Sequence, residues 1–223
     1  MKLEGITINF LGDSITFGAL LDNPEEEVFH AVMKKETGIK EIRNYGIPGT
    51  KFALQTATEE KPLDDYVDKN SFCERFDKMD DDADLVVVFG GTNDYGYGTA
   101  LLGGFSDRTP ETFYGACHYL FSGLVKKYLG KPIVVMTPLH RKGETLNSGT
   151  SKSQGVGTLK EYVNIIREVA EYYSLPVLDL YAQSGLQPEI PEIKQAYIPD
   201  GLHPNDAGHQ VMAHKLEVFL RSL

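Results

Sequence analysis

The feature that most constrains this chain is a regular alternation of short apolar runs with longer segments of helical period. Five apolar runs are typical of buried strands, at residues 6–11, 41–45, 85–89, 133–137 and 177–180. Helices are expected at residues 25–36, 72–79, 110–129, 159–173 and 206–223. Strands that alternate with helices pair in parallel and are covered on both faces. The sequence therefore predicts an α/β fold with a five-stranded parallel sheet, in a single domain over residues 1–223.

Composition and charge restrict the kind of partner. The chain is 41% hydrophobic and 24% charged, as in ordinary globular proteins, but its net charge is −10. Surfaces that bind nucleic acid or anionic membranes need positive charge, so neither partner is expected. No apolar run approaches a membrane span, and the first strand follows the N-terminus with no room for a secretory signal. We therefore expect a cytoplasmic protein that acts on a small molecule.

The cysteines and the acidic run do not indicate a metal or thiol site. Cys73 and Cys117 both lie in helix-like segments, which favours free thiols in a reducing compartment. A catalytic thiol is disfavoured because neither cysteine follows a strand. The acidic run at 80–82 precedes a strand at its amino end, where a solvated turn is expected.

Chemistry-bearing residues follow the predicted strands. In open α/β sheets, ligands bind outside the carboxyl ends of the strands. The segments there read GDS at 12–14, NYGIPG at 44–49, GGTND at 90–94 and TPLH at 137–140, and DGLHPN at 200–205 precedes the last helix. Each alone is explained as a turn or a helix cap. Their arrival at one edge of one sheet indicates a functional site.

Together these segments supply the parts of an acyl-transfer site. A serine hydroxyl becomes nucleophilic when an imidazole accepts its proton, and a carboxylate holds that imidazole in the correct tautomer. Ser14, His203 and Asp200 are the candidates for the three catalytic roles. The tetrahedral intermediate needs hydrogen-bond donors for its oxyanion, for which we expect the Ser14 N–H, the Gly46 N–H and the Asn93 amide.

The four blocks GDSIT, NYGIPGT, GGTND and DGLHPN, in this order, resemble those of the GDSL esterase/lipase family, also called SGNH hydrolases. The first block has Ile15 where the family name has Leu. The resemblance implies a flavodoxin-like three-layer α/β/α sandwich and a serine hydrolase that uses no metal or cofactor. It assigns the same catalytic and oxyanion roles to the same residues. Asp13 is expected to brace the loop.

Three functions are weighed on this basis. The favoured one is an esterase for short-chain carboxylic esters, with O-acetyl groups on carbohydrates as one substrate class. The alternatives are a lysophospholipase or thioesterase for longer acyl chains, and a non-catalytic carbohydrate-binding protein. The intact set of Ser14, Asp200 and His203 disfavours the last, because binding alone does not require all three. The expected partner is a small-molecule ester or an acetylated carbohydrate, and the oligomeric state stays open.

Two long connections, at 92–109 and 139–156, are expected to overhang the site. Substrate-binding candidates are Tyr95 and Tyr97 in the first and His140 in the second. Tyrosines among small polar residues suit a sugar ring, whereas a long acyl chain would need a continuous apolar wall. Tyrosines that simply pack the loop are the alternative. These residues predict a preference for acetyl or propionyl esters.

Overall fold

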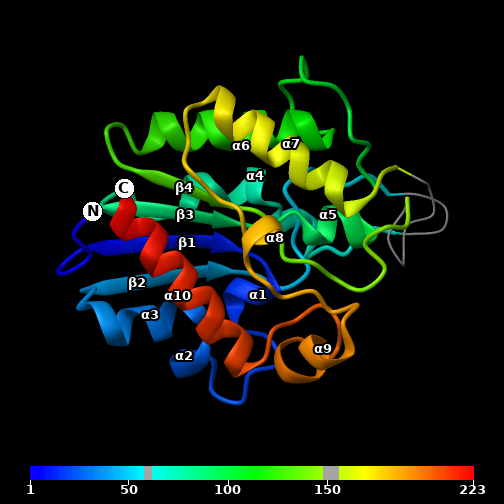
Figure 1. Ribbon diagram of the computed structural model, residues 1–223. Helices are drawn as coiled ribbons and strands as arrows, with labels where there is room; N and C mark the ends of the chain where they lie inside the picture. The colour runs from blue at the N-terminus through cyan, green and yellow to red at the C-terminus, as the bar shows by residue number, and fades with distance from the viewer. Residues whose placement is uncertain (58–61, 148–155) are drawn as a thin grey trace.

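The sheet has five parallel strands in the order β2-β1-β3-β4-β5, which confirms the predicted fold (Figure 1). The computed structural model describes residues 1–57, 62–147 and 156–223. The strands are β1 (Thr7–Gly12), β2 (Glu41–Gly46), β3 (Leu85–Phe89), β4 (Ile133–Met136) and β5 (Val177–Leu178). Every residue of β1, β3 and β4 is buried, as expected for strands covered on both faces.

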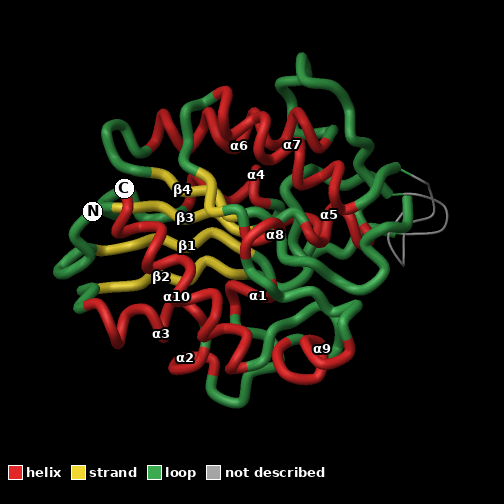
Figure 2. The backbone as a smooth tube through the Cα atoms, viewed as in Figure 1, coloured by secondary structure: helices red, strands yellow, loops and turns green. Residues whose placement is uncertain are grey.

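Helices cover both faces of the sheet. α3 (Phe29–Thr37) and α10 (Asp206–Ser222) pack on one face, and α6 (Phe113–Lys127) and α7 (Leu159–Tyr172) on the other (Figure 1). The shorter helices are α1 (Ser14–Phe17), α2 (Pro24–Glu27), α4 (Phe72–Arg75), α5 (Thr92–Tyr97), α8 (Leu180–Gln183) and α9 (Pro191–Tyr197), with 3₁₀ turns at Asp68–Asn70 and Phe76–Lys78. Much of the loop backbone gathers beyond the carboxyl ends of the strands (Figure 2).

Three predicted helices and one predicted strand have different boundaries in the structure. The segment 72–79 is the four-residue helix α4 followed by a 3₁₀ turn, and the strand expected at 177–180 ends at Leu178. The segment 25–36 forms two helices because Val28 is extended and interrupts the helical path. The segment 110–129 begins later than expected, since the Thr112 side chain accepts the first-turn N–H of Gly115 as the cap.

The strand register places the site segments at one level. Gly12 pairs with Gly46 of β2 and with Phe89 of β3, so the three strands end side by side. Helix α1 then folds tightly over these ends. A Cβ on Gly12 would lie 1.9 Å from Thr16 Oγ1, so only glycine permits this approach. The chain that leaves β1 is thereby directed along the carboxyl edge of the sheet.

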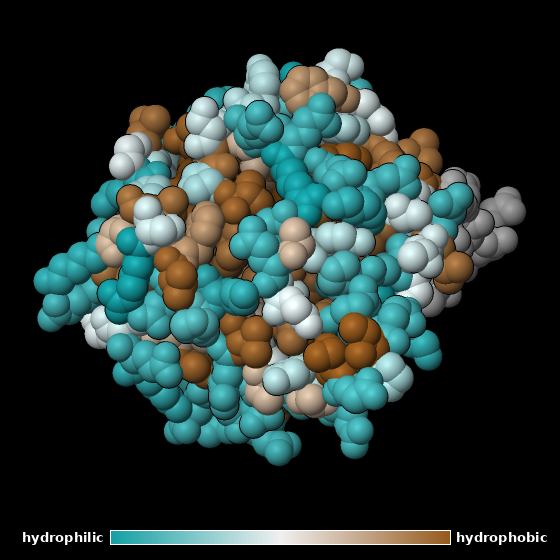
Figure 3. Space-filling view, in the orientation of Figure 1, coloured by the Kyte–Doolittle hydropathy of each residue, from teal (hydrophilic) through white to brown (hydrophobic). Residues whose placement is uncertain are grey.

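The surface is largely polar. Figure 3 shows hydrophilic residues over most of one face, with apolar residues in small separate groups. The acidic run is a surface turn in which Asp82 forms an ion pair with Arg43, and Asp80 accepts from the Tyr45 hydroxyl at 2.9 Å. Within the described ranges, no helix combines the length and the apolar character needed to cross a bilayer.

Both cysteines are buried, free thiols, as predicted. Cys73 on α4 donates to the Ala116 carbonyl of α6, with 3.5 Å between sulfur and oxygen. Burial raises the pKa of both thiols well above their usual value. Neither has the lowered pKa of a nucleophilic cysteine.

Two histidines are buried between α3, α10 and the sheet. Phe29 N–H donates to His209 Nδ1 at 3.2 Å, and His30 Nε2 lies 3.0 Å from the Thr16 carbonyl oxygen. Burial lowers the pKa of His30 to about 4 and that of His209 to about 3. Both rings are therefore neutral in the folded protein at pH 5, whereas in the unfolded chain they would be protonated.

We predict that the protein loses stability as the pH falls from about 6.5 towards 4. The unfolded state then binds protons that the two folded histidines do not, which costs on the order of 2 kcal/mol for each histidine at pH 5. Asp13 acts in the opposite direction, because burial raises its pKa to about 6 and the folded state then binds its proton first.

The variant His209→Asn isolates one contribution, because its side-chain oxygen, attached to Cγ as Nδ1 is, can still accept from Phe29 N–H but does not titrate. Unfolding free energies of this variant and the wild type should be compared at pH 7 and pH 5. The variant should lose less stability over this interval. An equal loss in both proteins would contradict the role of His209.

Candidate active site

The structure brings the three predicted catalytic side chains into one hydrogen-bonded series. Ser14 Oγ lies 3.0 Å from His203 Nε2, and His203 Nδ1 lies 2.7 Å from Asp200 Oδ2. Ser14 is the first residue of α1, while the other two lie on the loop before α10. They meet because this loop and the end of β1 share the carboxyl edge of the sheet.

Asp200 is held in its charged form. Partial burial raises its pKa, but hydrogen bonds from the His203 side chain, His203 N–H and Leu202 N–H outweigh burial and leave the pKa below its usual value. An ionised carboxylate only accepts hydrogen bonds, so the proton of the neutral ring is on Nδ1. His203 Nε2 therefore presents its lone pair to the Ser14 hydroxyl.

Asp13 lies beneath this series and is 1% exposed. Its Oδ1 accepts from Ile15 N–H at 3.0 Å and so caps α1. This contact agrees with the expected bracing role. Its buried carboxyl lies close enough to His203 and Arg75 for their charges to lower its pKa, although desolvation is the larger effect.

The GGTND segment anchors the neighbouring loop from inside. Asn93 is 2% exposed, and its Nδ2 donates to the Thr50 carbonyl at 3.0 Å. Asp94 accepts from Phe52 N–H and Ala53 N–H at 3.0–3.1 Å. An amide nitrogen carries two hydrogens, so Asn93 retains one for a substrate.

The structure does not leave Gly46 free for its predicted oxyanion role. Its N–H already donates to Asn44 Oδ1 at 2.9 Å. Gly49, three residues later, has a positive φ of 78° and makes no backbone N–H hydrogen bond within the described ranges. A Cβ on Gly49 would lie 3.4 Å from the Tyr97 hydroxyl, and Ile47 N–H donates to the Gly12 carbonyl at 3.1 Å, so this turn lies beside the end of β1 that leads to Ser14. Gly49 is therefore the better candidate for the oxyanion donor. The sequence indicated it only as the second glycine of the NYGIPG segment.

The two predicted substrate-binding tyrosines have different environments. Tyr95 is 1% exposed, and its hydroxyl donates to the carbonyls of Gly143 and Leu146 at 2.6 and 3.2 Å. It is thus a core residue that supports the following loop, and its predicted contact with substrate stays a prediction. Tyr97 is half-buried at the end of α5, with Lys51 Nζ 4.9 Å from its ring centroid.

The connection 92–109 does not overhang the site as a loop. Its first part is helix α5, and Phe105 in its second part packs against His118 and Tyr172, with ring centroids 5.0 and 5.5 Å apart. These aromatic contacts carry the segment outward over α6 and α7. Of the second connection, residues 148–155 lie outside the described ranges.

Residues 10–211 match the GDSL-like Lipase/Acylhydrolase family. The chain belongs to this family. It is a hydrolase family that acts on esters, which agrees with the resemblance found in the sequence. No match is found among curated proteins.

Several solved structures have the same fold as this GDSL-family protein, and three of them are compared with it below. A protein from Lactobacillus plantarum is 29% identical over 98% of both chains, with a TM-score of 0.82. A lipase/acylhydrolase from Enterococcus faecalis is 20% identical over 97% of this chain and 96% of its own, with a TM-score of 0.61. A two-domain esterase active on acetylated mannans is 22% identical over 99% of this chain and 50% of its own, with a TM-score of 0.62.

Sequence reasoning missed Arg75, which is 6% exposed beneath the strand ends. Its guanidinium donates to the carbonyls of Gly12 at 2.6 Å, Asn70 at 2.9 Å and Tyr45, and to the Thr50 hydroxyl at 3.1 Å. Burial lowers its pKa to about 10, so it remains charged at neutral pH. An arginine in an ordinary helical segment gives no sequence signal for such a role.

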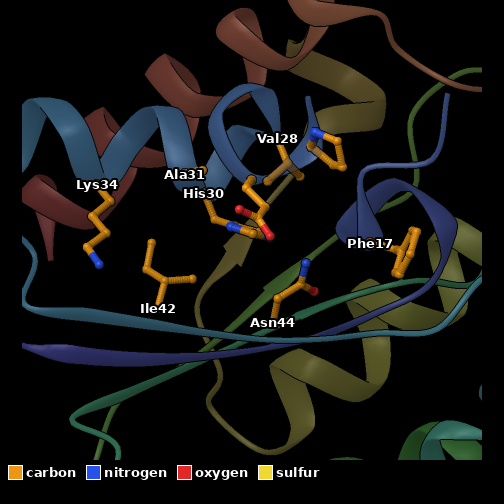
Figure 4. A pocket seen from close by; sticks show the side chains of 9 residues that line it. Phe17, Val28, His30, Ala31, Lys34, Ile42 and Asn44 are labelled. Carbon is orange, nitrogen blue, oxygen red and sulfur yellow. The ribbon is translucent and has the colours of Figure 1, made fainter. Parts of the chain in front are cut away.

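A groove of about 410 Å³ lies beside the edge strand β2 (Figure 4). The apolar side chains of Phe17, Val28, Ala31 and Ile42 line it, together with Lys34, Glu25, Pro24, His30 and Asn44. The catalytic candidates do not line this groove. Phe17 nevertheless ends the helix that begins at Ser14, so the groove is a neighbour of the site.

We predict that Arg75→Met lowers kcat by about 10- to 100-fold and changes KM much less. Without the guanidinium, the Gly12 and Tyr45 carbonyls lose a shared donor, and the loops that carry the nucleophile and the Gly49 turn shift relative to each other. A misplacement of about 1 Å is sufficient for a loss of this size. Ester hydrolysis and thermal unfolding should be measured together.

The exposed Arg108 offers a matched control, and Arg108→Met should leave both kinetic constants near the wild-type values. Arg75→Lys, which retains a donor, should recover part of the lost turnover. A lower melting temperature with normal kcat in Arg75→Met would show that the residue only stabilises the fold.

Proposed function

We propose that this protein is a serine esterase that hydrolyses short-chain carboxylic esters, including O-acetyl groups on carbohydrates. The observation that carries the proposal is the 3.0 Å contact of Ser14 Oγ with His203 Nε2, backed by Asp200 on the other ring nitrogen. A protein that only binds carbohydrate has no need for this series, which disfavours the non-catalytic alternative.

In the proposed acylation step, Ser14 Oγ attacks the ester carbonyl carbon while His203 Nε2 accepts the hydroxyl proton. The tetrahedral intermediate then collapses, the bond to the leaving oxygen breaks, and His203 returns the proton to the departing alcohol. In deacylation, water attacks the acyl-serine carbonyl carbon while His203 Nε2 accepts its proton. The proton then returns to Ser14 Oγ as the carboxylic acid is released. Asp200 stays ionised throughout and stabilises the imidazolium.

Three donors are proposed for the oxyanion: Ser14 N–H, Gly49 N–H and the second hydrogen of Asn93 Nδ2. Asn93 contacts the Thr50 carbonyl, so it lies next to the turn that contains Gly49. Such donors act where charge develops, and one of them contributes about 10²–10³ in kcat.

The proposed substrate class rests on the polar residues of the same edge. Tyr97 borders the Gly49 turn, and the half-apolar, half-polar character of a tyrosine suits contact with a sugar. The mannan esterase named above shares this fold, which makes acetylated sugars the first natural substrates to test.

We predict that Ser14→Ala folds normally but loses at least about 10⁴-fold in kcat on 4-nitrophenyl acetate, because the nucleophile is removed. A fluorophosphonate should label the wild type at Ser14 and leave the variant unlabelled. Ser106→Ala, at an exposed serine, serves as the control and should react as the wild type does. Near-normal turnover by Ser14→Ala would remove this residue from the mechanism.

A second candidate function is hydrolysis of longer acyl esters, as in a lysophospholipase or thioesterase. The observation that favours it is the groove beside β2, whose apolar side chains could shield an acyl chain from water (Figure 4). Each buried methylene would contribute about 0.8 kcal/mol. The charged Lys34 and Glu25 on the same wall oppose this use.

The two functions are separated by acyl chain length. We expect kcat/KM on 4-nitrophenyl esters to be highest for acetyl or propionyl and to fall by at least about tenfold at octanoyl, because the polar site edge gives extra methylenes no apolar contact. The variant Ala31→Glu places a charge in the groove and should leave this profile unaltered. A profile that peaks at eight carbons or more, and that Ala31→Glu abolishes, would favour the second function.

A further inference from the structure

A second histidine–carboxylate pair lies on the loop after β4. His140 Nδ1 lies 2.8 Å from Glu144 Oε1 and 3.0 Å from Oε2. The same carboxylate accepts from Arg141 N–H at 3.0 Å and from the Gln187 amide at 3.3 Å. Glu144 is 7% exposed, so this is a built arrangement and not a surface ion pair.

The pair fixes the orientation and the tautomer of His140. Burial raises the pKa of Glu144, but the hydrogen bonds from His140 and Arg141 outweigh it and leave the pKa below its usual value. The ionised carboxylate accepts only, so Nδ1 of the neutral ring carries the proton and Nε2 is an acceptor. Tyr181 stacks on the ring, with 4.0 Å between the centroids, and limits its rotation.

This pair lies next to the catalytic loop. Lys142 N–H donates to the Gly201 carbonyl at 2.8 Å, which joins the His140 loop to the loop of Asp200 and His203. His140 borders the same narrow gap as Leu202 and Asp13, the neighbours of His203 and Ser14 in the chain, and this gap is too small to hold a water molecule. Its Nε2 has no protein partner within the described ranges, and the side chain is 20% exposed.

We infer that His140 Nε2 is a substrate-recognition acceptor, which takes a hydrogen bond from a free hydroxyl of a partly acetylated sugar held at Ser14. This inference rests on the proposed function and names its substrate class more narrowly. The two pairs share one construction, a carboxylate on Nδ1 that leaves Nε2 for another partner, but in the described part of the chain only the ring of His203 contacts a serine. His140 is left to accept from a donor that the substrate brings, and esters without a hydroxyl lack that donor.

The test compares two sugar substrates that differ in their hydroxyl groups. Methyl mannoside carrying one acetyl group has free hydroxyls, whereas the fully acetylated methyl mannoside has none. The wild type should have the higher kcat/KM on the monoacetate. His140→Phe retains the ring that stacks on Tyr181 but removes the acceptor, and should lower the ratio of the two kcat/KM values by about tenfold. The matched exchange at an exposed histidine, His214→Phe, should leave the ratio as in the wild type.

A second variant tests the tautomer. In Glu144→Gln, the new amide can donate to Nδ1, which places the ring proton on Nε2 and turns the acceptor into a donor. The ratio should then fall as in His140→Phe. An unchanged ratio in His140→Phe, or equal losses on both sugars, would overturn the inference. Activity on 4-nitrophenyl acetate that survives Ser14→Ala would instead refute the proposed function, so the two failures are distinguishable.

Discussion

The arrangement at the strand ends depends on a buried cation that has no carboxylate within ion-pair distance in the described part of the chain. Where parallel strands end, their last carbonyl groups leave the hydrogen-bonded ladder and need new donors. The Arg75 guanidinium supplies these donors to Gly12 and Tyr45, at the ends of the two strands that carry the nucleophile and the glycine turn. A charge that bonds to backbone dipoles tolerates little displacement, because leaving its donors unpaired in the interior costs free energy. The hydrogen bonds of Arg75 to the backbone thus maintain the geometry of the site.

Much of the fold and of the site could be predicted from the sequence. The strand at 85–89 is a continuous apolar run between polar turns, and the structure reproduces its limits. The contact of Ser14 with His203 could be foreseen because the carboxyl ends of parallel strands share one edge, whichever loops join them. Both predictions depend on periodicity and strand direction, which single sequences express directly.

The other features of the site depend on the orientation of individual peptide planes and side chains, which no residue pattern in a single sequence encodes. Whether Gly46 or Gly49 presents its hydrogen to a substrate follows from the rotation of each peptide plane, and the Asn44 side chain decides it. Tyr95 occupies a polar, glycine-rich stretch, but the six-residue helix α5 directs it into the core. Helices of four to seven residues are too short to display a period. The role of Arg75 likewise arises only when distant carbonyls converge.

The reactivity of the two buried cysteines reports on local unfolding of the protein. Cys73 of α4 and Cys117 of α6 face the same core, and as buried neutral thiols they react slowly with an alkylating agent in the folded form. Faster modification requires a state in which these helices have separated. Helix α4 contains Cys73 and ends at Arg75. The rate at which the thiol is alkylated therefore measures how often the region that supports the strand ends unfolds locally.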